Sequence, residues 1–339
     1  MPQAMEYETI GKPEYWVDVV SNVESDACPL SSMLQKRGRP LQVITNWQVQ
    51  GYRRRGHRGV RDGSDATNFT YNPRKRLQGV AQKTWDPRGT SDFAEEVEVK
   101  GEGLSRGEMA AQIADAMVTV KQTIERRLGS NEESAVQDAD DPTGANETRG
   151  FFKWLDTSAQ SHLPVDENYR PNSNQLYTGT LANFDEDALK DMAKAAWKRR
   201  LGNSVRMTGF LGIDLKSKVS EFTRYDDEAS QKVSVRTYNQ DASSKALIEI
   251  IDRLVLDTGT IDLLATAHLM TDADTGEDTD YTHKSGLFLD LTKASLDYMR
   301  LPRVFKLPYA GGGYKAVADA IFVGRIDNPV GSFSARINS

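Results

Sequence analysis

Cysteine is almost absent from this 339-residue sequence, and histidine is scarce. Cys28 is the only cysteine, so no disulfide can form within the chain and the fold does not depend on an oxidising compartment. The four histidines have no metal-ligand spacing relative to one another or to Cys28. We therefore expect neither a disulfide-stabilised fold nor a metal site.

Long apolar runs and sorting signals are also lacking. The longest nearly apolar stretch, IDLLATAHLM, is too short to span a bilayer. The first residues, MPQAMEYETIGKPEYW, lack the basic start and apolar core of a secretory signal. We therefore expect an intracellular chain with no membrane partner.

The motifs of common enzyme classes are missing. The sequence has no HExxH, GxSxG, GxxxxGK[ST] or GxGxxG pattern. Three glycines at 311–313 precede Lys315, but the serine or threonine and the helix that complete a phosphate-binding loop do not follow, so a β-turn is predicted. His268 lies in an apolar run, which favours a buried histidine over a ligand. We expect no catalytic residue, no cofactor and no enzymatic activity.

An aspartate-rich segment, TDADTGEDTDY (271–281), is the closest approach to a metal-binding loop. An EF-hand loop has glycine at its sixth position and glutamate at its twelfth. Counted from Asp272, glycine falls at the fifth position and His283 at the twelfth. The pattern fails and favours an exposed acidic hairpin tip, with weak surface binding of a divalent cation left open.

The charge distribution is uneven along the chain. There are 43 basic and 49 acidic residues, giving a net charge of −6, whereas dedicated nucleic-acid-binding domains are usually basic. Five arginines nevertheless lie within positions 53–61 of the segment GYRRRGHRGVRDGSD. This segment separates two strand-like stretches, LQVITNWQVQGY and QGVAQKTWD, so we expect a long two-stranded projection with a polar tip.

This basic projection needs a support, because an isolated two-stranded ribbon is only marginally stable in water. Residues 51–88 contain ten basic and three acidic residues, whereas 92–102 contain five acids and one lysine. Residues 131–147 add six acids and no base, in what we predict to be a solvated loop. We expect the projection of one copy to lie across an acidic surface of another copy. A solvated loop without a partner and direct contact with nucleic-acid phosphates remain alternatives.

The strongest secondary-structure signal is LSRGEMAAQIADAMVTVKQTIERRLGSN. Its large apolar residues recur at spacings of four, four, three, four and four, which places them on one helical face. Ser105 with Glu108 forms a capping-box pattern, and Gly129 is a typical C-terminal stop. The spacing predicts a helix at 105–128, about 36 Å long. Its expected core face consists of Met109, Ile113, Met117, Val120, Ile124 and Leu128.

The remaining patterns predict an α+β fold. A second helix is expected at 184–201, with acids in its first turn and bases in its last. SVRMTGFLG predicts a buried strand, and IDLKSKVSEF a helix directly after it. DFAEEVEVKG has strand-like alternation, and the 286–336 region predicts short strands with one small helix, TKASLDYM. Short helices are expected in PEYWVDVVSNV and CPLSSMLQKRGRP.

This order of elements, with the segments ESDACPLSSML and TNWQVQGY, resembles the major capsid proteins of tailed phages with the Hong Kong 97-like fold. The resemblance covers nearly the whole chain. It implies an N-terminal arm, an extended loop, a peripheral domain with a long spine helix, and an axial domain. The corresponding ranges are 1–44 for the arm, 45–92 for the extended loop, 93–157 for the first part of the peripheral domain with spine helix 105–128, 158–285 for the mainly axial domain, and 286–339 for the peripheral strands and C-terminus.

The resemblance also implies a function. Copies would assemble into hexamers and pentamers of an icosahedral shell that encloses double-stranded DNA without sequence-specific binding. The shell would be the virion capsid, assembled in the host cytoplasm. The extended loop would lie over the neighbouring subunit, through inter-subunit contacts of Arg53, Arg54, Arg55, Arg58, Arg61, Arg74, Lys75 and Arg76.

Further partners follow from the same resemblance. Many relatives carry an N-terminal scaffolding region that is cleaved off, whereas this sequence starts almost directly at the arm. A separate scaffold or prior cleavage is therefore expected, together with a portal and a decoration protein. Two alternatives remain open: an encapsulin-like nanocompartment shell protein of the same fold, and a nucleic-acid-binding module that uses the basic projection.

Overall fold

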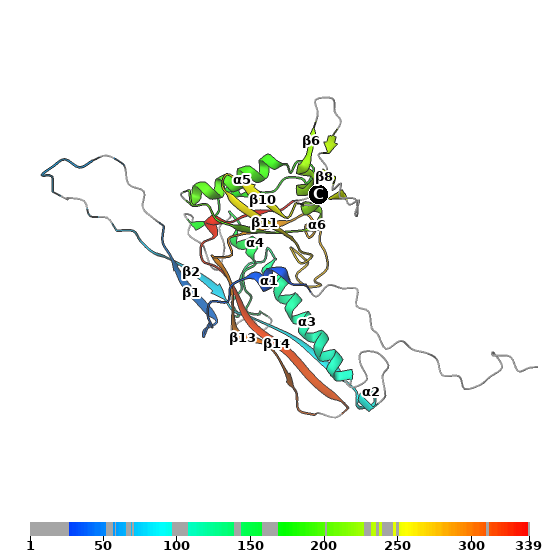
Figure 1. Ribbon diagram of the computed structural model, residues 1–339. Coiled ribbons are helices and arrows are strands. Elements are labelled where there is room, and N and C mark those ends of the chain that lie inside the picture. Colours follow the sequence, from blue (N-terminus) through cyan, green and yellow to red (C-terminus); the bar gives the residue numbers. More distant parts are fainter. Residues whose placement is uncertain are drawn as a thin grey trace, which may run out of the picture. The chain divides into compact units, whose positions relative to one another are not determined.

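Figure 1 shows a computed structural model of the chain, which divides into two compact units. Unit 1 contains Met1–Ala27, Trp85–Val120 and Arg303–Asp319, and unit 2 contains Cys28–Thr84, Lys121–Pro302 and Ala320–Ser339. The structure describes residues 27–51, 57, 59–65, 69, 71–96, 108–138, 144–157, 169–200, 202–226, 232–234, 237–238, 247–248, 251–309 and 312–337.

The core of unit 2 is a mixed sheet of six strands in the order β10-β11-β5-β12-β15-β4. β5 runs parallel to β11, and β15 runs parallel to β4, while the other neighbouring pairs are antiparallel. Every residue of β5 is buried, as expected for a strand covered on both faces, which confirms the strand predicted in SVRMTGFLG. The strands are β4 (Leu176–Tyr177), β5 (Met207–Leu211), β10 (Arg253–Leu256), β11 (Gly259–Ala265), β12 (Gly286–Leu289) and β15 (Phe333–Ala335).

Two predicted helices pack on this core. α5 (Glu186–Arg199) begins after Asp185, whose carboxylate accepts a hydrogen bond from the Ala188 N–H at 2.8 Å. α6 (Ile213–Ser220) follows β5 directly. Both lie where their sequence patterns predict, and both contribute buried side chains to one apolar cluster with the strands. The members from the two helices are Leu189, Met192, Ala193, Ala196, Leu215 and Val219.

The long helix α3 (Glu108–Leu128) confirms the helical periodicity, and the border between the units falls within it. Positions 105–107 lie outside the described residues. Of the six residues expected on its core face, Ile113 and Met117 are half-buried, and the buried stripe runs through Ala116 instead of Met117. The other four expected residues are buried: Met109, Val120, Ile124 and Leu128.

A buried carboxylate on α3 holds the short helix α1 (Pro29–Met33), which lies in CPLSSMLQKRGRP as predicted. The two oxygens of Glu125 accept hydrogen bonds from the backbone N–H groups of Leu30 and Ser31, each at 2.7 Å. These donors belong to the first turn of α1, where no intrahelical acceptor is available. Burial raises the pKa of Glu125, and the hydrogen bonds from Ser31 and Leu30 oppose that rise.

The structure confirms that the two strands at the base of the predicted projection pair with each other. β1 (Ile44–Val49) pairs with β2 (Lys75–Val80) in an antiparallel register that runs from Ile44↔Val80 to Val49↔Lys75. The stretch QGVAQKTWD is not one strand, however. β2 ends at Val80, and β3 (Gln82–Thr90) belongs to a different sheet. Val80 and Ala81 are both buried, which interrupts the alternation of buried and exposed side chains that one continuous strand would show.

The second sheet contradicts one sequence prediction. It has the order β13-β14-β3, with β13 at Ala294–Lys306 and β14 at Tyr314–Ile326. The small helix predicted in TKASLDYM is wrong, because β13 begins there. The Leu296 N–H donates to the Gln35 carbonyl at 2.9 Å, a contact between segments distant in sequence that local helix propensity does not report.

The strand-like alternation of DFAEEVEVKG predicts a strand, and this prediction is wrong for the described part of the segment. Its first part forms the short helix α2 (Asp92–Glu96), and 97–101 lie outside the described residues. The Ser91 hydroxyl accepts a hydrogen bond from the Ala94 N–H at 3.2 Å, which stabilises the helix start. The helix predicted at 13–23 also lies outside the described part of the chain.

The remaining elements are short. β6 pairs with β7 and β8 pairs with β9, each antiparallel. Within the described ranges, no helix is long and apolar enough to cross a membrane. The bounds are α4 Phe151–Trp154, η3 Ser173–Gln175, η4 Glu221–Thr223, η5 Pro329–Gly331, β6 Arg224–Asp226, β7 Lys232–Ser234, β8 Thr237–Tyr238 and β9 Leu247–Ile248.

The burial pattern of α3 predicts different costs for two substitutions by aspartate. Ile124→Asp places an unpaired charge in the core and should lower the free energy of unfolding by about 4 kcal/mol or more. Met117→Asp changes a half-buried position and should cost clearly less in the unassembled subunit. Urea unfolding followed by circular dichroism compares the two; equal costs would contradict the buried stripe.

Candidate inter-subunit interface

The β1–β2 arm, defined here as residues 44–80, is fastened to the rest of unit 2 by a stack in which two tryptophans lie between two arginines. The Arg325 guanidinium lies 5.0 Å from the ring centroid of Trp47 on β1. Trp47 packs on Trp154 with ring centroids 5.6 Å apart, and the Arg149 guanidinium lies 4.5 Å from the Trp154 ring centroid. Each cation–π contact contributes about 0.5–2 kcal/mol, with the larger values where the groups are desolvated. The stack therefore fixes the base of the arm.

The innermost cation of this stack is itself held in place. Arg149 is fully buried, and its Nε lies 2.7 Å from a carboxylate oxygen of Glu133. Burial lowers the pKa of Arg149, and the charge of Glu133 opposes that change. Arg149 thus couples the arm base to the acidic segment 131–147.

That acidic segment is not the solvated loop that its composition predicts. Glu133 pairs with Arg149, and Glu147 pairs with Arg127 at 3.0 Å. Arg127 also donates to the Thr148 carbonyl at 2.7 Å. The sequence prediction is wrong for these residues because the arginines that neutralise them lie outside the segment.

The second strand of the arm lies close against β14 within the same unit. A Cβ added at Gly79 would lie 3.0 Å from Val323 Cγ2 and 3.2 Å from the Trp47 ring, so this position accepts only glycine without local rearrangement. Leu77 and Val80 on either side are buried. The sequence offers little sign of this close contact beyond the glycine itself.

Beyond the paired strands, side-chain hydrogen bonds still join the two segments of the arm. Gln50 donates to the Asn72 carbonyl at 3.1 Å, Asn72 donates to the Gly51 carbonyl, and the Gly51 N–H donates to the Tyr169 hydroxyl at 3.1 Å. Further out, residues 61–64 form a tight turn in which Gly63 adopts a positive φ of 72°. The polar tip expected from the sequence corresponds to this turn.

The arm also exposes large apolar side chains. Val60, Phe69 and Tyr71 are 75%, 87% and 85% exposed. Sequence reasoning missed them, although FTYN is the one aromatic cluster in an otherwise polar segment. Exposed apolar side chains of this size are a common feature of surfaces that contact another protein.

The basic residues expected to contact a neighbour are placed as follows. Arg61 at the tip turn is exposed, and Arg74, Lys75 and Arg76 at the start of β2 are exposed. The remaining four lie outside the described residues: Arg53, Arg54, Arg55 and Arg58.

Two of the acids at 92–96 have partners within unit 1. Asp92 accepts a hydrogen bond from the Tyr309 hydroxyl at 2.6 Å, and Glu95 accepts one from the Met109 N–H at 3.1 Å. They therefore contribute to the local fold of unit 1 as well as to its negative charge.

The aspartate-rich loop 271–281 is an irregular loop and not a hairpin tip, because no strand flanks it directly. Asp272 Oδ1 accepts hydrogen bonds from the N–H groups of Asp274 and Thr275, at 3.0 and 2.8 Å. The hydrogen bonds from Thr275 and Asp274 lower the pKa of Asp272. No group of three or more potential ligands is arranged to hold a metal ion within the described ranges. His268 is buried, as predicted, and burial lowers its pKa.

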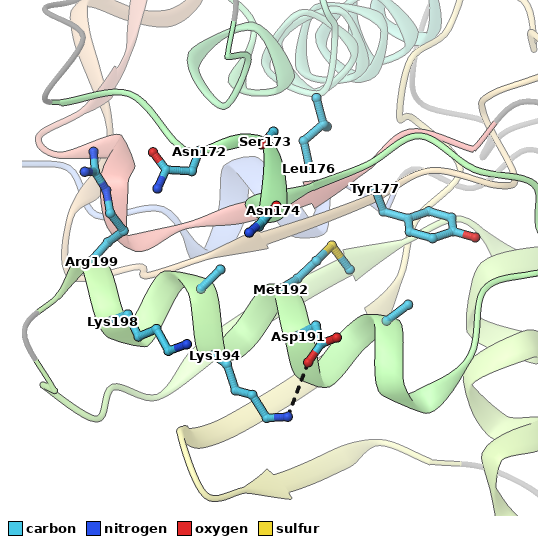
Figure 2. Close-up of a pocket in the computed structure, with 12 residues that line it drawn as sticks. Asn172, Ser173, Asn174, Leu176, Tyr177, Asp191, Met192, Lys194, Lys198 and Arg199 are labelled. Atoms are coloured by element: carbon cyan, nitrogen blue, oxygen red, sulfur yellow. Dashed lines mark hydrogen bonds and ion pairs between the residues drawn. The ribbon is translucent and has the colours of Figure 1, made fainter.

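A second feature of unit 2 is a groove of about 580 Å³ between α5 and the segment 172–177, shown in Figure 2. Met192 contributes apolar surface from α5, and Lys194 and Lys198 contribute ammonium groups from the same helix. Leu176 is also among the lining residues, with its side chain turned away from α5. Lys194 also lies 3.2 Å from the carboxylate of Asp191. This lining suits the docking of a protein segment that carries both an apolar and an acidic side chain.

Comparison with known proteins identifies the family. The family model described as SU10 major capsid protein matches residues 3–319. None of the curated proteins matches the sequence.

Solved capsid structures share the fold over almost the whole chain. The capsid of a native GTA particle aligns with a TM-score of 0.59 at 13% identity, covering 98% of this chain and 97% of that chain. The capsid of cyanophage Pam1 gives 0.59 at 11% identity, covering 97% of each chain. The capsid of cyanophage P-SCSP1u gives 0.58 at 10% identity, covering 96% of this chain and 93% of that chain.

At these identities the structures establish the fold, and the family model establishes the role. The α+β, Hong Kong 97-like fold expected from the order of elements is confirmed. The chain belongs to the SU10 major capsid protein family and is a structural, non-enzymatic phage capsid protein.

Proposed function

We propose that this capsid protein assembles into hexamers and pentamers of an icosahedral shell around double-stranded phage DNA, and that the β1–β2 arm of each copy docks on a neighbouring copy. The observation that carries the docking proposal is the contrast within the arm. Its base is clamped at Trp47, whereas its outer part exposes Phe69, Tyr71 and basic side chains.

Burial of the apolar side chains supplies most of the docking free energy. Covering an exposed aromatic side chain contributes about 2 kcal/mol, whereas an exposed ion pair contributes about 0–1 kcal/mol. The charges of Arg61, Arg74 and Arg76 therefore set the register and speed the encounter more than they add affinity. The clamped base lowers the conformational entropy lost on docking, because β1 and β2 are already paired and held at Trp47 before a neighbour binds.

The family match supports a place in the virion capsid. We extend the proposal to assembly in the host cytoplasm with a separate scaffold, a portal and a decoration protein on the outside. The capsid protein encloses DNA without reading its sequence, which agrees with a net charge of −6. The family match favours this role over a nanocompartment shell or a nucleic-acid-binding module.

Charge reversal on the arm should impair assembly without unfolding the subunit. Replacing Arg61, Arg74, Lys75 and Arg76 by glutamate changes only exposed positions, so the thermal midpoint should shift by no more than about 2 °C. The yield of shells, measured by electron microscopy and light scattering, should fall about tenfold or more because like charges then face each other.

A second arm variant separates apolar from electrostatic docking. Phe69→Ser with Tyr71→Ser should reduce shell yield at every salt concentration, whereas the loss caused by charge reversal should shrink as salt increases. Normal shell yield from both variants would contradict the docking of the arm.

The clamp predicts a stability difference between two tryptophans. Trp47→Ala removes a buried ring from the stack and should lower the free energy of unfolding by about 3–5 kcal/mol. Trp85→Ala, at a position that is 64% exposed, is the matched control and should cost less than about 1 kcal/mol. Chemical denaturation of unassembled subunits measures both, and similar costs would rule out the clamp.

A further inference from the structure

Among the residues that the structure describes, the central sheet of unit 2 ends in two edge strands, β10 on one side and β4 on the other. An edge strand leaves backbone N–H and C=O groups without a strand partner, and proteins usually cover or pair such edges. Five strand spacings separate the two edges, which is roughly 24 Å. They therefore cannot meet within one copy and can meet only between copies.

The β10 edge presents an apolar side chain next to acids. Val255 on β10 is 78% exposed, although it stands between two leucines that pack against the core. Asp257 is exposed in the turn that follows, and Asp187 is exposed in the first turn of α5. Lys190 lies among these acids: it pairs with Glu186 at 2.6 Å, and this hydrogen bond, with the charges of Asp187 and Asp257, raises the pKa of Lys190.

The β4 edge presents the complementary surface. The groove of about 580 Å³ lies beside β4, and Leu176 of that strand contributes to its lining (Figure 2). Lys194 and Lys198 line it from α5 and are exposed. Both ends of the sheet thus combine an apolar contact with charge. Acids outnumber Lys190 at the β10 end, whereas the lysines outnumber Asp191 in the groove, so the excess charges have opposite sign.

We infer that the groove beside β4 receives the β10 edge and the β10–β11 turn of a second copy. Val255 of one copy enters this groove between β4 and α5, and Asp187 and Asp257 face Lys194 and Lys198 of the other. This inference rests on the proposed function, since it names surfaces through which the copies meet.

The two surfaces are different, so the contact is head-to-tail. Each copy receives one neighbour in its groove and inserts its own β10 edge into the next. A head-to-tail contact closes into a ring when the rotation per copy allows it. The proposed hexamers and pentamers require such a ring.

A charge swap in the full-length protein tests the contact. The groove variant carries Lys194→Glu and Lys198→Glu, the edge variant carries Asp187→Lys and Asp257→Lys, and the combined variant carries all four. The yield of shells should fall about tenfold in the groove variant and in the edge variant, and should return to within about threefold of wild type in the combined variant. Lys293→Glu, an exposed charge reversal outside both surfaces, is the matched control and should assemble normally.

The outcomes distinguish this contact from the proposed function itself. Wild-type protein that forms no shells, even with the phage scaffold present, would contradict the proposed function. Wild-type shells together with normal assembly of the groove and edge variants would overturn the edge-to-groove contact alone, and so would failure of the combined variant.

Disulfide crosslinking tests the same contact without the charge substitutions, in case those substitutions destabilise the subunit. In a Cys28→Ser background, Asn174→Cys combined with Val255→Cys should give a ladder of disulfide-linked oligomers from oxidised shells on a non-reducing gel. Either new cysteine alone should leave monomer. Monomer from the double-cysteine shells would overturn the inference.

Discussion

The packing of Trp47 between Arg325 and Trp154 is the contact on which the arm depends. It joins β1 to β14 and to α4, three elements far apart in the sequence, and through Arg149 it reaches the acidic segment 131–147. A two-stranded ribbon alone would be marginal in water. Buried at its base, the same ribbon can project basic and aromatic side chains while the subunit remains folded.

The acidic residues of the chain have two different roles. Glu125, Glu133 and Glu147 are bound inside unit 2, where they cap α1 or neutralise buried arginines. Asp187 and Asp257 remain exposed at the end of the sheet. The net charge of the chain therefore does not describe the surface that a neighbouring copy meets. Some of the acidic side chains are neutralised or hydrogen-bonded within the subunit.

Local sequence patterns predicted the elements whose stability is local or whose burial is periodic. The apolar spacing predicted α3 and α5, and the segment SVRMTGFLG predicted the buried strand β5. The patterns failed where a distant segment decides the structure, as at β13, whose first residues bond to Gln35. For the candidate interface, composition revealed the basic arm, but the exposed Phe69 and the groove beside β4 depend on which side chains the fold leaves uncovered.

Docking of the arm on a neighbouring copy is the central claim, and a cryo-electron microscopy reconstruction of shells formed by the full chain tests it most directly. The account predicts that Phe69 and Tyr71 of one copy are buried against a neighbouring copy, with Arg61 beside an acidic side chain of that neighbour. An arm that stays exposed to solvent, or that folds back onto its own subunit, would contradict it.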